Sequence, residues 1–166
     1  MNLQKNLLNI GTIVNTFGTK GMVKMVISEN TFINGDISEI KLVFTKKDSG
    51  SYIPLRVEEI QNKENNLLIK FVGLDSINDV VKFKNINLFF DNTDEIFIYE
   101  TPLTEFICIY GNDKIKVIDL MNNGVQDLIK VSYKLKEFWI PMVEMFVDNI
   151  DEQEQKIYLK NIEGLM

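Results

Sequence analysis

The sequence predicts an all-β protein of two small β-barrels joined by a short acidic linker. Short runs rich in β-branched and apolar residues recur along the chain, and clusters of turn-forming residues separate them. The segment Glu39–Phe44 alternates polar and apolar side chains, the pattern of a strand buried on one face. A length of 166 residues allows one compact domain or two small ones. The polar segment Asp91–Glu95 is the predicted linker and gives domains at residues 1–92 and 97–166.

The first half contains predicted strands and one predicted helix. Pro54 has no amide hydrogen for a strand ladder, so its strand is expected at a sheet edge or to begin there. Asp75 and Ser76 are good N-caps, and apolar residues at mixed helical spacing follow them, which predicts a helix over residues 76–84. The predicted strands are Leu8–Val14, Met22–Ile27, Glu39–Phe44, Tyr52–Val57, Leu67–Val72 and Ile86–Phe90.

The second half follows the same pattern. Gly111–Asp113 is typical of a tight hairpin turn, and residues 142–147 are expected to form a helical turn after Pro141. The predicted strands are Phe106–Tyr110, Lys114–Ile118, Asp127–Tyr133, Phe138–Ile140 and Lys156–Leu159.

The composition excludes several kinds of chemistry. The chain has no histidine, which removes His-based acid–base catalysis and His-ligated metals. The single cysteine, Cys108, excludes an intramolecular disulfide and a multi-cysteine zinc site. No apolar run approaches the ~20 residues that span a bilayer, and the first residues do not resemble a signal peptide. We therefore expect a cytoplasmic protein without a membrane segment, metal or cofactor.

The net charge of −6 is unevenly distributed along the sequence. Residues 1–92 carry 11 Lys+Arg and 10 Asp+Glu, a balance of +1, whereas residues 93–166 carry 7 Lys and 14 Asp+Glu, a balance of −7. An acidic half repels phosphate and attracts basic partners. Either this half faces a basic protein, or the acidic surface serves solubility alone.

The loop Phe17–Gly21 places Lys20 between Gly18 and Gly21. Such a loop lets backbone amides approach a phosphate while the lysine supplies charge. The alternative is that each glycine only supplies the positive φ of a hairpin turn.

Two further clusters are ambiguous. The carboxylates of Asp148, Asp151, Glu152 and Glu154 could serve hydrolysis or bind a divalent cation, but a solvated acidic turn explains them more simply. The aromatic residues Phe97, Tyr99 and Phe106 lie beside Glu95, Glu100 and Glu105, and they either dock a basic protein or pack in the core at a domain junction.

Several segments, in order along the whole chain, resemble the RimM family of ribosome maturation factors. The opening segment runs through a glycine-led strand to an aromatic-Gly-x-x-Gly turn, with Phe17 where the family usually has histidine. Gly11, Gly18, Gly21 and, near the end, Gly164 are the expected structural turn glycines. The similar segments are Ile10–Met25, Val72–Ser76, Asn123–Leu128, Ile140–Pro141, Phe146–Val147, Ile150–Asp151, Lys156–Leu159 and Glu163–Leu165.

The resemblance implies a six-stranded RimM-type barrel followed by a PRC-barrel. It implies a non-enzymatic, monomeric factor that binds the immature 30S subunit, assists 16S rRNA processing and docks on small-subunit ribosomal protein nineteen. Phe97, Tyr99, Glu100, Glu105 and Phe106 are then the expected docking residues. The family's adjacent tyrosine pair is replaced here by a degenerate Glu95–Tyr99 stretch.

Lys20 and Lys24 are the expected rRNA contacts of the near-neutral first barrel. The competing interpretation is a PRC-barrel adaptor or small-ligand-binding β-barrel unrelated to ribosomes, which predicts a well-formed apolar cavity. A hydrolase using Asp148 and Asp151 would need a metal or a raised carboxylate pKa.

Overall fold

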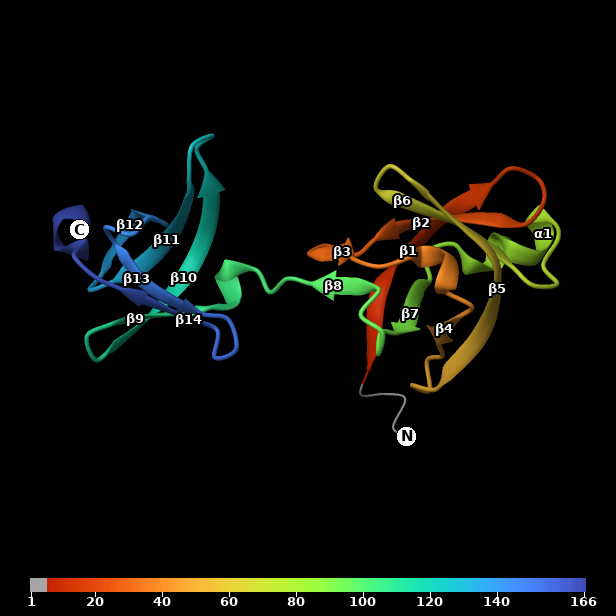
Figure 1. Ribbon diagram of the computed structural model, residues 1–166, viewed down its shortest axis with the longest axis horizontal. Coiled ribbons are helices and arrows are strands. Elements are labelled where there is room, and N and C mark those ends of the chain that lie inside the picture. Colours follow the sequence, from red (N-terminus) through yellow and green to blue (C-terminus); the bar gives the residue numbers. More distant parts are fainter. Residues whose placement is uncertain (1–5) are drawn as a thin grey trace. The chain divides into compact units, whose positions relative to one another are not determined.

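The computed structural model describes residues 6–166 and divides the chain into two compact units, between Glu100 and Thr101 (Figure 1). Each unit has its own hydrophobic core. Within the described residues, no helix is long and apolar enough to cross a membrane. The predicted all-β, two-unit architecture is confirmed.

The first unit is built on a closed barrel in the strand order β1-β2-β6-β5-β4-β7. Its interior is filled by the apolar side chains that alternate along these strands, among them Ile10, Met25 and Leu67. The barrel strands are β1 (Leu7–Phe17), β2 (Met22–Ile27), β4 (Leu42–Lys46), β5 (Tyr52–Lys63), β6 (Asn66–Phe71) and β7 (Asn87–Asp91).

Pro54 lies where the sequence predicts, in a part of β5 with a partner on one side. It is opposite Phe44 of β4, whereas the pairing of β5 with β6 begins only at Val57. The missing amide hydrogen of proline therefore interrupts no ladder to a second neighbour.

The predicted helix is present as two short pieces, α1 (Ile77–Val80) and the 3-10 turn η3 (Val81–Phe83). Ser76 is the N-cap, and with Asp79 it forms a capping box in which each side chain accepts from the other residue's backbone. The cap satisfies backbone amides that a helix of one turn would otherwise leave unpaired.

Two strands that the sequence does not predict form a separate ribbon. β3 (Thr31–Ile33) pairs antiparallel with β8 (Phe97–Tyr99), with Phe32 opposite Ile98. A 3-10 turn, η2 (Ile37–Glu39), follows β3, so the expected strand Glu39–Phe44 begins only at Leu42. The Asp36 side chain caps this turn by accepting from the Ser38 amide.

The ribbon corrects the predicted domain boundary. β8 belongs to the first unit, so the acidic segment before it is a turn inside that unit and the connection between the units follows Glu100. With this boundary residues 1–100 carry 11 Lys+Arg and 13 Asp+Glu, a balance of −2, and residues 101–166 carry 7 Lys and 11 Asp+Glu, a balance of −4. The charge asymmetry between the units is smaller than the sequence division suggests.

The second unit is a six-stranded sheet in the order β12-β11-β10-β9-β14-β13. All neighbours are antiparallel except β9 and β14, which run parallel with Ile157 beside Cys108. A 3-10 turn, η4 (Leu103–Glu105), precedes the sheet, and another, η5 (Ile162–Leu165), closes the chain. The strands are β9 (Ile107–Tyr110), β10 (Asp113–Asn122), β11 (Asp127–Tyr133), β12 (Lys136–Pro141), β13 (Val147–Asp151) and β14 (Lys156–Leu159).

Strand β13 differs from the prediction. Residues 143–146 form the turn after Pro141, but the chain becomes extended at Val147 and pairs with β14. Three of the five residues of β13 are exposed and two are half-buried, so the strand shows little of the apolar alternation that identifies a strand.

Candidate functional site

The glycine loop between β1 and β2 is fixed by its contact with the turn before α1. Gly18 and Gly21 have φ of +67° and +86°, in the left-handed region, as the hairpin-turn interpretation expects. A Cβ atom on Gly21 would lie 2.1 Å from the Leu74 carbonyl oxygen. Figure 1 shows α1 beside this loop. Glycine at position 21 therefore permits the loop to rest directly on the chain at Leu74.

Lys70 holds the turn on which this loop rests. Its side chain is 10% exposed, and its Nζ donates to the Phe71 carbonyl at 2.8 Å and to Asp75 Oδ1 at 2.9 Å. Glu58 adds an ion pair at 3.2 Å. The hydrogen bond to Asp75 raises the pKa of Lys70 against the opposing effect of burial, and Glu58 raises it further. The ammonium group thus stays charged and fixes the segment that supports the glycine loop.

A small hollow of about 100 Å³ is lined by two lysines, Lys24 and Lys63. Lys24 of β2 and Lys63 of β5 line it together with Phe17, and the Lys63 Nζ lies 5.2 Å from the centre of the Phe17 ring. Phe17 is 40% exposed although it ends a core strand. The remaining lining residues are Glu64, Asn66 and Leu68. Two ammonium groups beside an exposed aromatic ring are the elements of a contact to phosphate and base.

Lys20 does not line this hollow. It is exposed in the glycine loop, whereas Lys24 is half-buried on β2. Lys63 is the residue that sequence reasoning missed. It lies 39 positions after Lys24, and only the neighbouring positions of β2, β6 and β5 in the barrel bring the two together.

The predicted docking residues fall into two groups. Phe97 is 1% exposed and packs edge-to-face on Phe90 in the first core, and Phe106 is 3% exposed in the second core. A partner cannot reach these two rings in this structure, so core packing accounts for both. Tyr99, Glu100 and Glu105 are exposed.

An exposed apolar pair accompanies Tyr99 in the first unit. Phe32 and Ile98 are opposite each other on β3 and β8, and they are 50% and 41% exposed. Directly opposed side chains share one face of a ribbon, so the two form a continuous apolar surface. The sequence gives no sign of it, because β3 was not predicted.

The acidic turn of the second unit is internally compensated. Asp148 pairs with Lys160 at 3.6 Å, and Glu154 lies 3.8 Å from Lys156. Asp151 accepts a hydrogen bond from the Glu154 amide. In residues 6–166 no three metal-ligating side chains form a group that could hold a metal ion. These contacts agree with the interpretation of the cluster as a solvated turn.

The single cysteine is not a candidate nucleophile. Cys108 is buried, and desolvation raises the pKa of its thiol to about 12, so it carries no reactive thiolate near neutral pH.

Gly11 lies inside β1 rather than in a turn, and a Cβ there would be 2.3 Å from the Val26 carbonyl oxygen. Gly164 lies in η5, and a Cβ there would meet nothing within 4 Å.

The fold defines a two-unit all-β protein whose first unit is a closed six-stranded barrel. Residues 8–95 match the model of the RimM N-terminal domain. The ribosome maturation factor RimM of Mesoplasma florum is 40% identical over 97% of this chain and 98% of its own. That of Thermotoga petrophila is 30% identical over 97% of each chain. The chain belongs to the RimM family of ribosome maturation factors.

A solution structure of the N-terminal domain of RimM from Thermus thermophilus covers 53% of this chain and 92% of its own, at 12% identity and a TM-score of 0.41. The family assignment depends on the sequence matches alone, and these extend along nearly the whole chain. They do not support the alternative of an adaptor or ligand-binding barrel unrelated to ribosomes.

Proposed function

We propose that this protein is a non-enzymatic assembly factor that binds the immature 30S subunit and promotes the processing and folding of 16S rRNA. It acts as a monomer in the cytoplasm, and its second unit is a PRC-barrel. The observation that supports this proposal most strongly is the 40% identity, over nearly the full length, to a ribosome maturation factor. The absence of histidine and the buried, protonated Cys108 agree with a role that needs no catalysis.

The factor works by differential binding. A protein that binds one arrangement of rRNA and ribosomal protein better than another shifts the population by that difference alone. A preference of about 1.4 kcal/mol changes the ratio of the two arrangements about tenfold. A few weak contacts that are made in only one of the two arrangements are therefore sufficient to shift the population.

The protein partner is small-subunit ribosomal protein nineteen. In the first unit, the exposed residues Tyr99 and Glu100 supply an aromatic anchor and a carboxylate for a basic surface. In the second unit, the exposed Glu105 supplies a further carboxylate. The second unit, with a balance of −4, adds long-range attraction. Phe97 and Phe106 are buried in the two cores and take no part in this contact.

The rRNA contact is made by the first unit. Lys24 and Lys63 bind phosphate, and Phe17 offers an exposed ring for stacking. Lys20 extends this basic surface along the glycine loop. The single carboxylate of the hollow, Glu64, leaves one positive charge in excess there.

The direct test is binding of the purified protein to immature 30S subunits, mature 30S subunits and the isolated ribosomal protein nineteen, each at several salt concentrations. We expect preference for immature subunits and salt-sensitive binding to the isolated protein. Absence of binding to all three at low salt would refute the proposal.

A pair of variants tests the docking residues. Tyr99→Ala is expected to weaken binding to ribosomal protein nineteen about tenfold and to leave the free energy of unfolding unchanged, because the side chain is exposed. The control is Val81→Ala, an equally exposed apolar residue of the first unit. Equal effects of the two variants on binding would contradict this role for Tyr99.

A further inference from the structure

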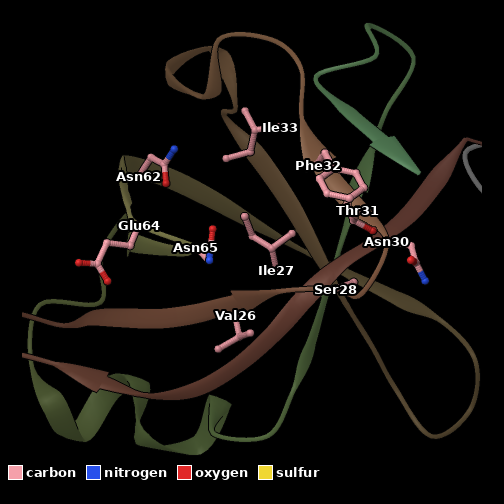
Figure 2. Close-up of a pocket in the computed structure, with 10 residues that line it drawn as sticks. All are labelled: Val26, Ile27, Ser28, Asn30, Thr31, Phe32, Ile33, Asn62, Glu64 and Asn65. Carbon is pink, nitrogen blue, oxygen red and sulfur yellow. The ribbon is translucent and has the colours of Figure 1, made fainter. Parts of the chain in front are cut away.

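A groove crosses the first unit between the β5–β6 hairpin and β3. Its volume is about 480 Å³ and it is open to solvent. Figure 2 shows Asn62, Glu64 and Asn65 on one side, β3 with Thr31 and Phe32 on the other, and Ile27 between them. The lining residues are Val26, Ile27, Ser28, Asn30, Thr31, Phe32, Ile33, Asn62, Glu64 and Asn65.

The Thr31 hydroxyl gives the first indication that this groove receives a ligand. Thr31 is 6% exposed, and among residues 6–166 its Oγ1 has no hydrogen-bond partner. A buried polar atom without a partner costs free energy, and nearly all such atoms in proteins are satisfied. Thr31 lines the groove, but its oxygen has less than 1 Å² of exposed surface, so a bound group meets it only when the side chain rotates toward the groove.

The backbone of β3 gives the second indication. In an antiparallel pair, alternate residues direct their backbone groups to the partner strand and away from it. Asn30 accepts from the Glu100 amide and Asn34 donates to the Ile96 carbonyl, so Thr31 and Ile33 direct theirs away from β8. Phe97, which is opposite Ile33, confirms this register because both of its backbone groups bind the Asn92 side chain.

One edge of the ribbon is therefore covered and the other is partly open. The Thr31 amide donates to the Ser28 carbonyl, which leaves the Ile33 amide and the Thr31 and Ile33 carbonyls for a partner strand. Asn92 occupies the outer edge of β8 at Phe97. In the part of the chain from residue 6 onward, no strand pairs with the outer edge of β3. An unpaired edge beside a groove is the arrangement to which an extended peptide adds as a further strand.

We propose that the groove binds an extended basic segment of another polypeptide, which pairs with the outer edge of β3. Apolar side chains of the segment pack on Ile27 and Ile33, and alternate side chains face Glu64. The amides of Asn62 and Asn65 offer donors and acceptors for its backbone. This site shares only Glu64 with the hollow at Lys24, and it does not depend on the ribosomal role.

The charge of the lining favours a basic peptide over a nucleic acid. None of the lining residues is cationic, and the one charged side chain is the carboxylate of Glu64. Phosphate groups would be repelled here, whereas lysine or arginine side chains would be attracted.

The experiment uses the full chain and a fluorescent dodecapeptide that alternates lysine and valine. Anisotropy should show saturable binding. A peptide with N-methyl groups on all backbone nitrogens, or with glutamate in place of lysine, should bind at least about tenfold more weakly. If the N-methylated peptide bound as tightly as the unmodified peptide, strand addition would be overturned, because the N-methylated peptide keeps the charge and loses the backbone donors.

Two substitutions place the peptide in the groove. Thr31→Val removes the unpaired hydroxyl and should weaken binding about threefold or more without lowering the free energy of unfolding. Glu64→Lys should weaken it about threefold, whereas the control Asp48→Lys, in an exposed loop away from the groove, should not. If Asp48→Lys weakens peptide binding as much as Glu64→Lys does, the attraction comes from the overall charge of the protein and the proposed site is refuted.

Amide hydrogen exchange tests the register. Peptide binding should slow exchange at Ile33, whose N–H faces away from β8, and should change exchange at Asn34, already bonded to Ile96, far less. Displacement of the peptide by a uridine dodecamer would instead indicate a nucleic-acid site. Peptide-independent dimerisation that protects Ile33 would indicate a second copy of this chain. Either result would overturn the proposal.

Discussion

The side chain of Asn92 takes the place of a neighbouring strand for Phe97. Asn92 Nδ2 donates to the Phe97 carbonyl at 2.7 Å, and the Phe97 amide donates to Asn92 Oδ1 at 2.9 Å. This pair of hydrogen bonds folds the acidic turn back on the first unit and brings the Phe97 ring against Phe90. The sequence Asp91–Glu95 therefore forms a structural turn rather than a connection between the two units.

Asn92→Ala should lower the free energy of unfolding of the first unit by about 1–3 kcal/mol, because two hydrogen bonds to partly buried backbone groups are lost. Asn92→Asp keeps the acceptor for the Phe97 amide but cannot donate to its carbonyl, so its effect should be smaller. Urea titrations of the three proteins provide the comparison. An aspartate variant as unstable as the alanine variant would show that the donated bond dominates.

Gly21 and Gly50 form a matched pair for the contact between the glycine loop and Leu74. Both have φ near +90°, but a Cβ at position 50 meets nothing within 4 Å, whereas at position 21 it would be 2.1 Å from the Leu74 oxygen. Gly50→Ala should cost about 1 kcal/mol from backbone strain alone, and Gly21→Ala should cost about 1–3 kcal/mol more. Thermal unfolding measures both, and equal losses would mean that the loop moves away without cost.

Lys70 should make stability depend on pH in the alkaline range. The pKa of Lys70 is raised in the folded protein above the ordinary value of 10.5, so its contribution is fully present below that value and is lost as pH rises through the folded pKa. Lys70→Met removes this contribution. The difference in unfolding free energy between the native protein and the variant should be constant near neutral pH and should shrink above the ordinary lysine pKa.

The partners of Lys70 set the size of that effect. Asp75 and Glu58 are well exposed, so Lys70→Met leaves no carboxylate buried without a partner and should cost about 1–2 kcal/mol at neutral pH. A difference that grew with pH would contradict the assignment of the ion pairs.

Lys24 and Lys63 are predicted to act together in rRNA binding. The double variant Lys24→Gln, Lys63→Gln should weaken binding to immature subunits and lower the salt slope by about 1–2, since two phosphate contacts are lost. Binding to isolated ribosomal protein nineteen should not change. The control is Lys46→Gln with Lys47→Gln, two exposed lysines elsewhere on the first unit. Loss of both activities in a folded double variant would refute separate RNA and protein surfaces.

Much of this protein was determined by its sequence. Runs of alternating apolar residues marked nearly all the barrel strands, and the Ser76 cap marked the helix. The order of the glycine loop and the later matching segments indicated the family. These signals are local, because one side chain after another reports burial or capping along a single element.

Tertiary structure decided the rest. β3 is too short and β13 too polar for periodicity to show; β3 is ordered by β8, a strand distant in the sequence, and β13 by the following strand β14. The burial of Phe97 follows from its pairing opposite Ile33, 64 positions away. Lys24 and Lys63 lie close together because their strands are near neighbours in the closed barrel. A sequence pattern records which faces are apolar, but which faces meet depends on non-local pairing, and only the closed barrel fixes that.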